Sequence, residues 1–181
     1  MRTLETLGFV RTKRFLAERF QPGDVEEWKR LHRDPVVMAT LGGLMEDDDT
    51  ERRFKIAMDH WDQHGFGGWS FREPGTRAFV ARGGLRHNTL EGVAEIELLY
   101  AVRPEWWNQG VATEIGELSL DAAFRVLGFS DVVCFTEPTN LKSQRVMQKL
   151  GFVYERDGFF AGTPHVFFRI RREAWLAAHA G

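Results

Sequence analysis

The sequence of 181 residues contains very little cysteine, and Cys134 is its only one. A single cysteine excludes a disulfide framework and a metal cluster built on thiolates. Cys134 stands in Val-Val-Cys-Phe, a run typical of a buried strand. We therefore expect an inert core thiol rather than a nucleophile.

Long apolar runs and an excess of one charge are missing as well. No stretch approaches the ~18 apolar residues of a membrane-spanning helix, and the first eight residues lack the apolar segment of a secretion signal. The formal net charge is −2, which provides no basic surface for nucleic acid or an anionic membrane. The sequence therefore predicts a cytoplasmic protein with neither kind of partner.

Two common phosphate-binding motifs are absent: a dinucleotide-binding Gly-x-Gly-x-x-Gly and a nucleotide loop ending in Gly-Lys-Ser/Thr. The apolar periodicity instead predicts an α/β domain spanning residues 1–181, in the order β-α-α-β-β-β-α-β-α-β-β. The strands are expected at residues 9–20, 67–72, 78–85, 93–102, 131–135, 152–155 and 164–170. The acidic run 46–49 is expected to begin a helix that ends near Gly65.

The stretch Glu97 to Glu114 combines a strand, a turn and a helix start. Its apolar run ends at Pro104, and a helix-periodic segment begins at Gly110. Such a turn directs several backbone N–H groups, together with the positive end of the helix, at one point. It predicts a phosphate or pyrophosphate site, although small residues at such a turn can also serve packing alone.

A second motif follows on a short helix, Asn140-x-x-Ser143-x-x-Val146-x-x-Lys149-Leu-Gly-Phe. Together with Gly110-x-Ala-Thr-Glu, it resembles the GNAT superfamily of acyl-CoA-dependent N-acetyltransferases. Over residues 10–172 the chain is most similar to the branch of ribosomal-protein N-terminal (alanine/serine) acetyltransferases. The resemblance implies a mixed α/β fold whose mostly antiparallel sheet is splayed between its fourth and fifth strands and flanked by helices. Acetyl-CoA, the cosubstrate, would lie in that cleft, and no metal is implied.

The resemblance also implies which residues hold acetyl-CoA. The pantetheine arm would follow Tyr100, Ala101 and Val102, and Asn140 and Ser143 would face the cosubstrate from the next helix. The pyrophosphate would bind the turn formed by Asn108, Gln109, Gly110, Val111, Ala112 and Thr113. Three residues depart from the family pattern: Trp107 replaces a usual Arg or Gln, Ala112 replaces the second glycine, as is common in this branch, and Met147 replaces a usual tyrosine. The change at Met147 makes Ser143 the candidate acid for the leaving thiolate.

Acetylation of an amine needs a group that accepts the amine's proton. Glu97 matches the family's acidic position, and Glu95 is the alternative because it lies on the same face of the strand. Either carboxylate could instead only orient the amine or face solvent.

The acceptor itself, a small-molecule amine or a protein N-terminus, is not specified by the sequence. Its pocket is expected from residues 36–45, 61–69 and the loop 157–164. His60 and His64 share a helical face and are expected to be a surface pair. A homodimer is one assembly that the resemblance allows. A non-catalytic acyl-CoA-binding or sensing domain on the same fold is the alternative function, suggested by the missing tyrosine.

Overall fold

The structure is a computed structural model that describes residues 7–180. Residues 1–6, on which the expectation of no secretion signal partly depends, lie outside the described residues. The strands are β1 (Phe9–Arg11), β2 (Leu16–Arg19), β3 (Gly68–Arg72), β4 (Phe79–Leu90), β5 (Val93–Val102), β6 (Asp131–Thr136), β7 (Val153–Phe160) and β8 (Thr163–Arg171). The α-helices are α1 (Val25–Arg33), α2 (Pro35–Met38), α3 (Asp47–His64), α4 (Val111–Asp121), α5 (Leu141–Lys149) and α6 (Arg172–Ala178).

The eight strands form one sheet in the order β1-β2-β3-β4-β5-β6-β8-β7. Every neighbouring pair is antiparallel except β5 and β6, which are parallel. The predicted mixed α/β fold with a mostly antiparallel sheet is confirmed. The parallel pair β5–β6 separates an N-terminal half of the sheet from a C-terminal half.

The first predicted strand, residues 9–20, is wrong as a single element. It is a hairpin of β1 and β2, which pair from Phe9↔Glu18 to Arg11↔Leu16. The turn is held by Thr12, whose backbone N–H donates to the Phe15 carbonyl and whose hydroxyl accepts from the Phe15 N–H. The sequence signal was weak because no glycine or proline marks this turn. The cleft predicted between the fourth and fifth strands is therefore the one between β5 and β6.

Two strands are longer than predicted. β4 continues through Arg86, His87 and Asn88 to Leu90, and a two-residue turn at Glu91 and Gly92 joins it to β5. Both turn residues have positive φ (50° and 85°), as two-residue hairpin turns require. Polar residues interrupt the apolar pattern of β4, although their backbones pair with β5. The apolar periodicity therefore predicts a strand that ends too early.

The β7–β8 hairpin shows the same kind of difference. It pairs from Val153↔Arg169 to Phe160↔Thr163, so most of the predicted loop 157–164 is paired strand. Its turn contains Ala161 and Gly162, again with positive φ. The acceptor side of the fold is consequently bordered by a hairpin rather than by an irregular loop.

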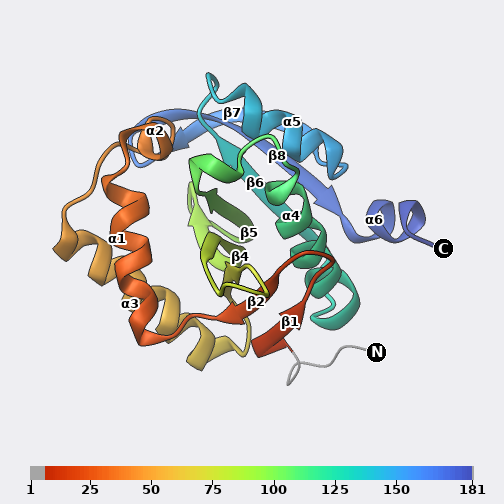
Figure 1. The fold of residues 1–181 in the computed structure, drawn as a ribbon. Helices are drawn as coiled ribbons and strands as arrows, with labels where there is room; N and C mark the ends of the chain where they lie inside the picture. The colour runs from red at the N-terminus through yellow and green to blue at the C-terminus, as the bar shows by residue number, and fades with distance from the viewer. Residues whose placement is uncertain (1–6, 181) are drawn as a thin grey trace.

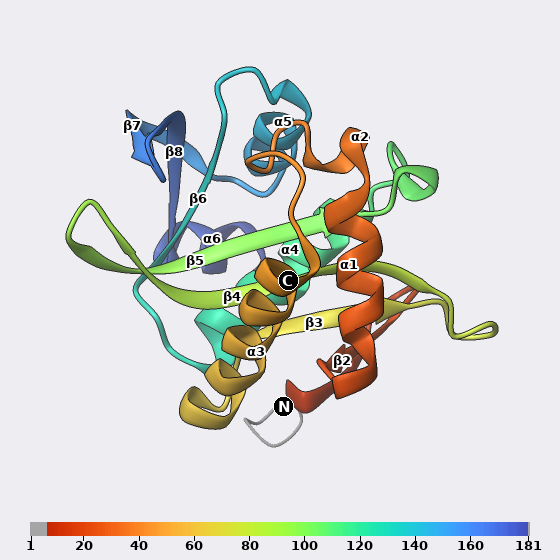
Figure 2. The same cartoon turned by 90° about the vertical axis from the view of Figure 1, so that its left-hand side faces the viewer.

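Helices cover both faces of the sheet (Figures 1 and 2). α1 and α3 lie across one face, and α4 lies across the other, where it contacts β4 and β5. α3 begins in the acidic run and ends at Gly65, whose left-handed φ of 72° forms its C-terminal cap, as predicted. The main core joins both layers and is rich in aromatic side chains, among them Phe15, Trp28, Trp69, Phe71 and Phe124.

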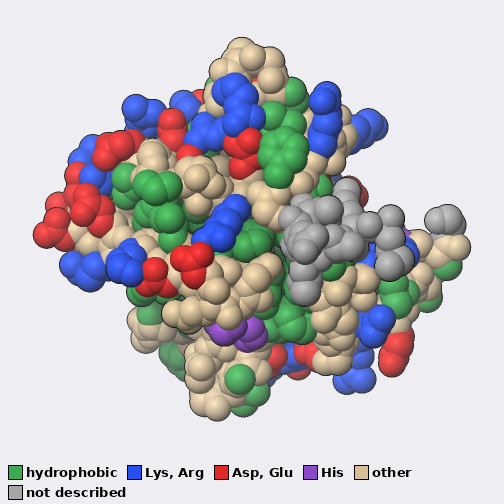
Figure 3. Space-filling view, turned by 90° about the horizontal axis from the view of Figure 1, so that it is seen from below, with side chains coloured by type: hydrophobic (Ala, Val, Ile, Leu, Met, Phe, Trp, Pro, Cys, Tyr) green, Lys and Arg blue, Asp and Glu red, His purple; other side chains and the backbone are tan. Residues whose placement is uncertain are grey.

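The surface carries charges of both signs. On the face shown in Figure 3, Lys and Arg side chains are interspersed with Asp and Glu, in keeping with the net charge of −2. No helix within residues 7–180 has the length and apolar character needed to cross a membrane.

Candidate active site

The sheet opens between β5 and β6. The two strands are in register at Glu97↔Val133 alone, so the following residues of β5 have no strand partner on that side. The Arg103 N–H donates to the Val80 carbonyl on β4 (3.0 Å). Because main-chain groups alternate along an antiparallel strand, those of Ala101 face β4 while those of Tyr100 and Val102 face the opening.

The turn before α4 leaves backbone donors unpaired. Gly110 is the N-cap residue of α4, with φ 74°, and no side chain caps the helix. The first helical hydrogen bond runs from Glu114 N–H to the Gly110 carbonyl (3.0 Å). The N–H groups of Val111, Ala112 and Thr113 therefore have no acceptor within the helix. Such free N–H groups at the positive end of a helix dipole can bind an anion.

Residues 108–110 shape this turn and are exposed. Asn108 also has a positive φ (60°), which asparagine tolerates better than most residues. A Cβ built on Gly110 meets only Arg14 Nη2, at 3.9 Å. The backbone of this turn is thus open to a ligand, and the pyrophosphate site stays a prediction.

Arg14, in the β1–β2 turn, forms hydrogen bonds with residues on both sides of Gly110. Its backbone N–H and Nε donate to the Glu114 carboxylate (3.0 and 2.7 Å), and its Nη1 donates to the Gln109 carbonyl (2.8 Å). Burial tends to raise the pKa of Glu114, but hydrogen bonds from Thr12 and Arg14 outweigh it and lower the pKa. Sequence reasoning missed this contact, which joins residues 100 positions apart.

Trp107 stands where the family usually has a longer polar residue. Its indole N–H donates to the Val102 carbonyl (2.7 Å), one of the main-chain groups that face the opening. The Lys142 ammonium lies over its ring, 4.8 Å from the centroid. Trp107 therefore closes one end of the opening and links β5 to α5.

Glu97 lies at the closed end of the opening and is 5% exposed. Its carboxylate accepts from Arg86 Nε (2.8 Å), Arg86 Nη2 (3.1 Å) and Asn88 Nδ2 (2.6 Å). A carboxylate can accept about four hydrogen bonds. The three protein donors thus leave about one acceptor position, on Oε1, for a further donor.

Glu95 is held differently. Its two oxygens accept from both Nη atoms of Arg169 (2.6 and 3.0 Å), which also pairs with Asp131 and Glu155. Hydrogen bonds to these three carboxylates, that of Glu95 first, raise the pKa of Arg169. Burial acts in the opposite direction and is outweighed. Glu95 therefore belongs to an ion-pair network between β5 and β8.

Ser143, on α5, meets Tyr100 across the opening. The two hydroxyl oxygens are 2.8 Å apart. Burial, and then the neighbouring Cys134, raise the pKa of Tyr100, so its phenol stays protonated at neutral pH. Burial likewise raises the pKa of Cys134, which fits the expected inert thiol. Met147, one turn after Ser143, is 0% exposed and belongs to the core.

Both polar atoms of the Asn140 side chain are hydrogen-bonded to the protein. Its side-chain oxygen accepts from the Ser143 N–H (3.1 Å), which caps α5, and its Nδ2 donates to Thr40 Oγ1 (2.9 Å). Thr40 follows α2, so Asn140 ties α5 to the segment expected to border the acceptor. The cap was foreseen from the sequence; the bond to Thr40 was not.

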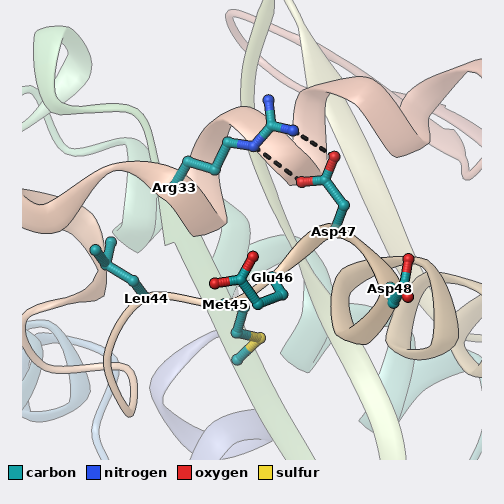
Figure 4. A pocket seen from close by; sticks show the side chains of 6 residues that line it. All are labelled: Arg33, Leu44, Met45, Glu46, Asp47 and Asp48. Atoms are coloured by element: carbon teal, nitrogen blue, oxygen red, sulfur yellow. Dashed lines mark hydrogen bonds and ion pairs between the residues drawn. The ribbon is translucent and has the colours of Figure 1, made fainter.

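An open pocket of about 580 Å³ lies where α1 ends and α3 begins. Arg33, Leu44, Met45, Glu46, Asp47 and Asp48 line it, and the ion pair of Arg33 with Asp47 spans the two helices (Figure 4). The Met45 N–H donates to the His32 carbonyl (3.2 Å). Part of the predicted acceptor segment 36–45 therefore lines a real concavity.

His60 and His64 are joined by His87 of β4, a residue that the sequence did not connect to them. Ring nitrogens of the three lie within 4.8 Å of one another, a spacing at which a metal ion could be held. The His60 Nε2, however, already accepts from the His87 backbone N–H (3.0 Å). Burial, with a contribution from His64, lowers the pKa of both His60 and His87. The absence of a metal site stays a prediction.

Three features occur together here: a splayed sheet, an uncapped helix start, and polar groups at the closed end of the opening. This combination is typical of acyl-CoA-dependent acyltransferases. A family profile described as acetyltransferase (GNAT) domain matches residues 14–153. The chain belongs to this family. It is an acetyltransferase that uses acetyl-CoA, as the resemblance implied.

Individual proteins are similar to this chain in sequence or in fold. An uncharacterized protein of Bacillus subtilis, YkkB, is 25% identical over 126 residues, 70% of this chain and 73% of YkkB. Two solved structures share the fold. A ribosomal-protein-S5-alanine acetyltransferase from Vibrio fischeri has a TM-score of 0.75 at 13% identity and covers 92% of this chain and 98% of that one. A spermidine N-acetyltransferase from Vibrio cholerae, in complex with CoA and spermine, has a TM-score of 0.70 at 17% identity and covers 90% of this chain and 98% of that one.

Proposed function

We propose that this acetyltransferase transfers the acetyl group to a primary amine, of a small molecule or of a protein N-terminus, by direct attack on the thioester. The observation that carries the proposal is the carboxylate of Glu97 at the closed end of the β5–β6 opening, with one acceptor position left. An amine N–H can fill that position next to a thioester in the opening.

Acetyl-CoA is held, in this proposal, mainly by backbone groups. The pyrophosphate accepts from the free N–H groups of residues 111–113, and the pantetheine amides pair with Tyr100 and Val102. Asn108, Gln109 and Gly110 supply the shape of the turn. Ala101 contributes a small side chain that packs with Leu31, Val37 and Met38 on the acceptor face.

The amine has to lose one proton during the reaction, because its neutral form attacks the thioester carbonyl. The C–N bond forms, a tetrahedral intermediate carries the negative charge on oxygen, and the C–S bond then breaks. Glu97 takes the proton from the attacking nitrogen, directly or through water. Glu95 is the alternative base, and it differs from Glu97 in that its partner Arg169 also pairs with Asp131 and Glu155.

The departing coenzyme A thiolate needs a donor, and Ser143 is the proposed one. Tyr100 supports it, because its phenol, 2.8 Å away, can donate a hydrogen bond to the serine oxygen. Position 147 lacks the family's usual tyrosine. The phenol of Tyr100 on β5 instead contacts Ser143, one turn before Met147 on α5. The alternative of a non-catalytic sensing domain, which rested on that missing tyrosine, loses its main support.

The direct test is release of coenzyme A thiol from acetyl-CoA in the presence of a panel of amines and N-terminal peptides, with the acetylated product identified by mass. The proposal expects amine-dependent release and one new amide per thiol released. Thiol release that does not depend on the amine, with no acetylated product, would contradict it. The homodimer and the cytoplasmic location stay predictions.

A further inference from the structure

Arg82 of β4 is a cation without a carboxylate partner among residues 7–180. Its Nη2 donates to His32 Nε2 (3.2 Å), and its guanidinium lies 4.3 Å from the ring centroid of Trp28. Its Nε–H is buried and meets no acceptor. A buried donor on a charged group costs free energy when left unpaired, so this arrangement needs an explanation.

His32 orients Arg82 but cannot neutralise it. The His32 ring is 1% exposed, and its Nδ1 lies 2.9 Å from Thr50 Oγ1 on α3. Burial, and then the charges of Arg82 and Arg53, lower the pKa of His32 to about 3. The imidazole is therefore neutral at physiological pH, with Nδ1–H donating to Thr50 and Nε2 accepting from Arg82.

Two further arginines, Arg53 and Arg86, repel the charge of Arg82. Arg53 on α3 has no carboxylate within ion-pair distance among the described residues, and Arg86 is paired with Glu97. Burial, followed by repulsion from Arg86 and Arg53, lowers the pKa of Arg82 to about 9. An anion placed here would relieve both the repulsion and the unpaired N–H.

The position of Arg82 connects it to the acceptor. In the β4–β5 register Arg82 pairs with Ala101, and Arg86 pairs with Glu97. Residues two apart share a face of a strand, so Arg82, Arg86 and Glu97 all project to the side covered by α1 and α3. Part of the Arg82 side chain remains accessible to solvent. An anionic group of a molecule bound at Glu97 could therefore reach it.

We propose that the acceptor amine carries a carboxylate, and that Arg82 binds this carboxylate while the amine lies at Glu97. The inference rests on the proposed function and adds a substrate class to it. Nε–H and the second N–H of Nη2 form the side-on fork that matches a carboxylate. Arg86 already uses the same two atoms, Nε and Nη2, for Glu97.

The experiment compares short ω-amino carboxylates with their methyl esters, which keep the amine and the chain length but remove the negative charge. Thiol release is measured for the wild type and for Arg82→Met. We expect the wild type to prefer the carboxylates about tenfold to a hundredfold in kcat/KM, mainly through KM, as loss of a charge-assisted hydrogen bond predicts. Arg82→Met should lose this preference.

Two further variants separate binding from general damage. Arg52→Met removes an exposed arginine of α3 that pairs with Asp49, and it should keep the preference. Arg82→Lys keeps the charge without the fork and should retain only part of it. Unchanged acetyl-CoA affinity shows that each variant is folded. A wild type that turns over carboxylates and esters equally overturns the proposal, as does a preference that survives in folded Arg82→Met.

Failure of the acetyl transfer itself is distinguishable. If no amine releases thiol, the proposed acceptor chemistry fails. Binding at the Arg82 site is then measured by calorimetry on the coenzyme A-loaded protein. Heat of binding for the ω-amino carboxylates that is absent for the esters and absent in Arg82→Met supports the carboxylate site. Equal or no binding of the two kinds of ligand by the wild type overturns it.

Discussion

At the scale of single residues, the contact between Tyr100 and Ser143 gives a first prediction. Ser143→Ala and Tyr100→Phe should each lower kcat about tenfold to a hundredfold, because a thiolate is a tolerable leaving group that benefits from a proton. Acetyl-CoA affinity should stay nearly unchanged. The double variant should be little worse than the more damaging single one, since the two hydroxyls act as one unit.

Rapid-quench measurement of the acetylation step checks this prediction. Ser130→Ala, which changes an exposed serine before β6, is the matched control and should retain the wild-type rate. A Ser143→Ala variant with full kcat, when chemistry limits turnover, would reduce Ser143 to a helix residue.

Glu97 gives the second prediction. Glu97→Gln should lower kcat/KM by about a hundredfold or more near pH 7, the scale of a positioned base. The loss should shrink toward high pH, where an amine with a pKa of about 10.4 becomes neutral without help. The pH dependence of kcat/KM provides the measurement.

Glu95→Gln is the control for Glu97, because it removes a carboxylate from the same strand face that is already paired with Arg169. It should leave the acidic limb of the profile in place. If Glu95→Gln removes that limb and Glu97→Gln does not, the two roles are exchanged.

The residues that could be predicted are those in short local motifs. The turn at Gly110 and the helix start near Ser143 could be predicted because each is fixed by a few neighbouring positions, and the roles of the two residues stay predictions. The partners of Glu97 could not be found in the same way. Arg86 and Asn88 face it only through the β4–β5 register, and they lie beyond the strand predicted for residues 78–85.

At the scale of elements, His32 links α1 to α3 and β4 and predicts a pH dependence of stability. Its pKa is about 3 in the fold and about 6.5 when unfolded. Between these values the unfolded chain binds more protons than the folded one. The contribution of His32 is therefore complete above about pH 6.5 and is lost as the pH falls, by at most about 1.4 kcal/mol per pH unit.

Denaturant unfolding between neutral pH and about pH 4 measures this effect. The stability of the wild type relative to His32→Gln should fall with decreasing pH. A difference between wild type and His32→Gln that is independent of pH would show that the ring protonates freely in the fold.

Element type was predictable where one face is apolar, and element length was not. The acidic start and glycine end of α3 were predicted because capping is a local property. Pairing between strands determines the β1–β2 hairpin and the lengths of β4 and β7. The periodicity of a single segment does not contain this information.

At the scale of the whole molecule, the account depends on one claim: acetyl-CoA lies in the opening between β5 and β6, with its pyrophosphate on the turn before α4. The fold brings this turn, the Arg14 contact and Glu97 together from distant parts of the chain. A negative charge placed on the turn should therefore repel the pyrophosphate without disturbing the sheet.

Calorimetric titration of acetyl-CoA into the wild type, Gly110→Asp and Gly110→Asn tests this claim most directly. Asparagine and aspartate have the same shape, both tolerate the positive φ of Gly110, and the space around its Cβ is open. The account predicts that Gly110→Asn binds within a few-fold of the wild type and that Gly110→Asp binds at least about a hundredfold more weakly. Wild-type affinity in a folded Gly110→Asp variant would contradict it.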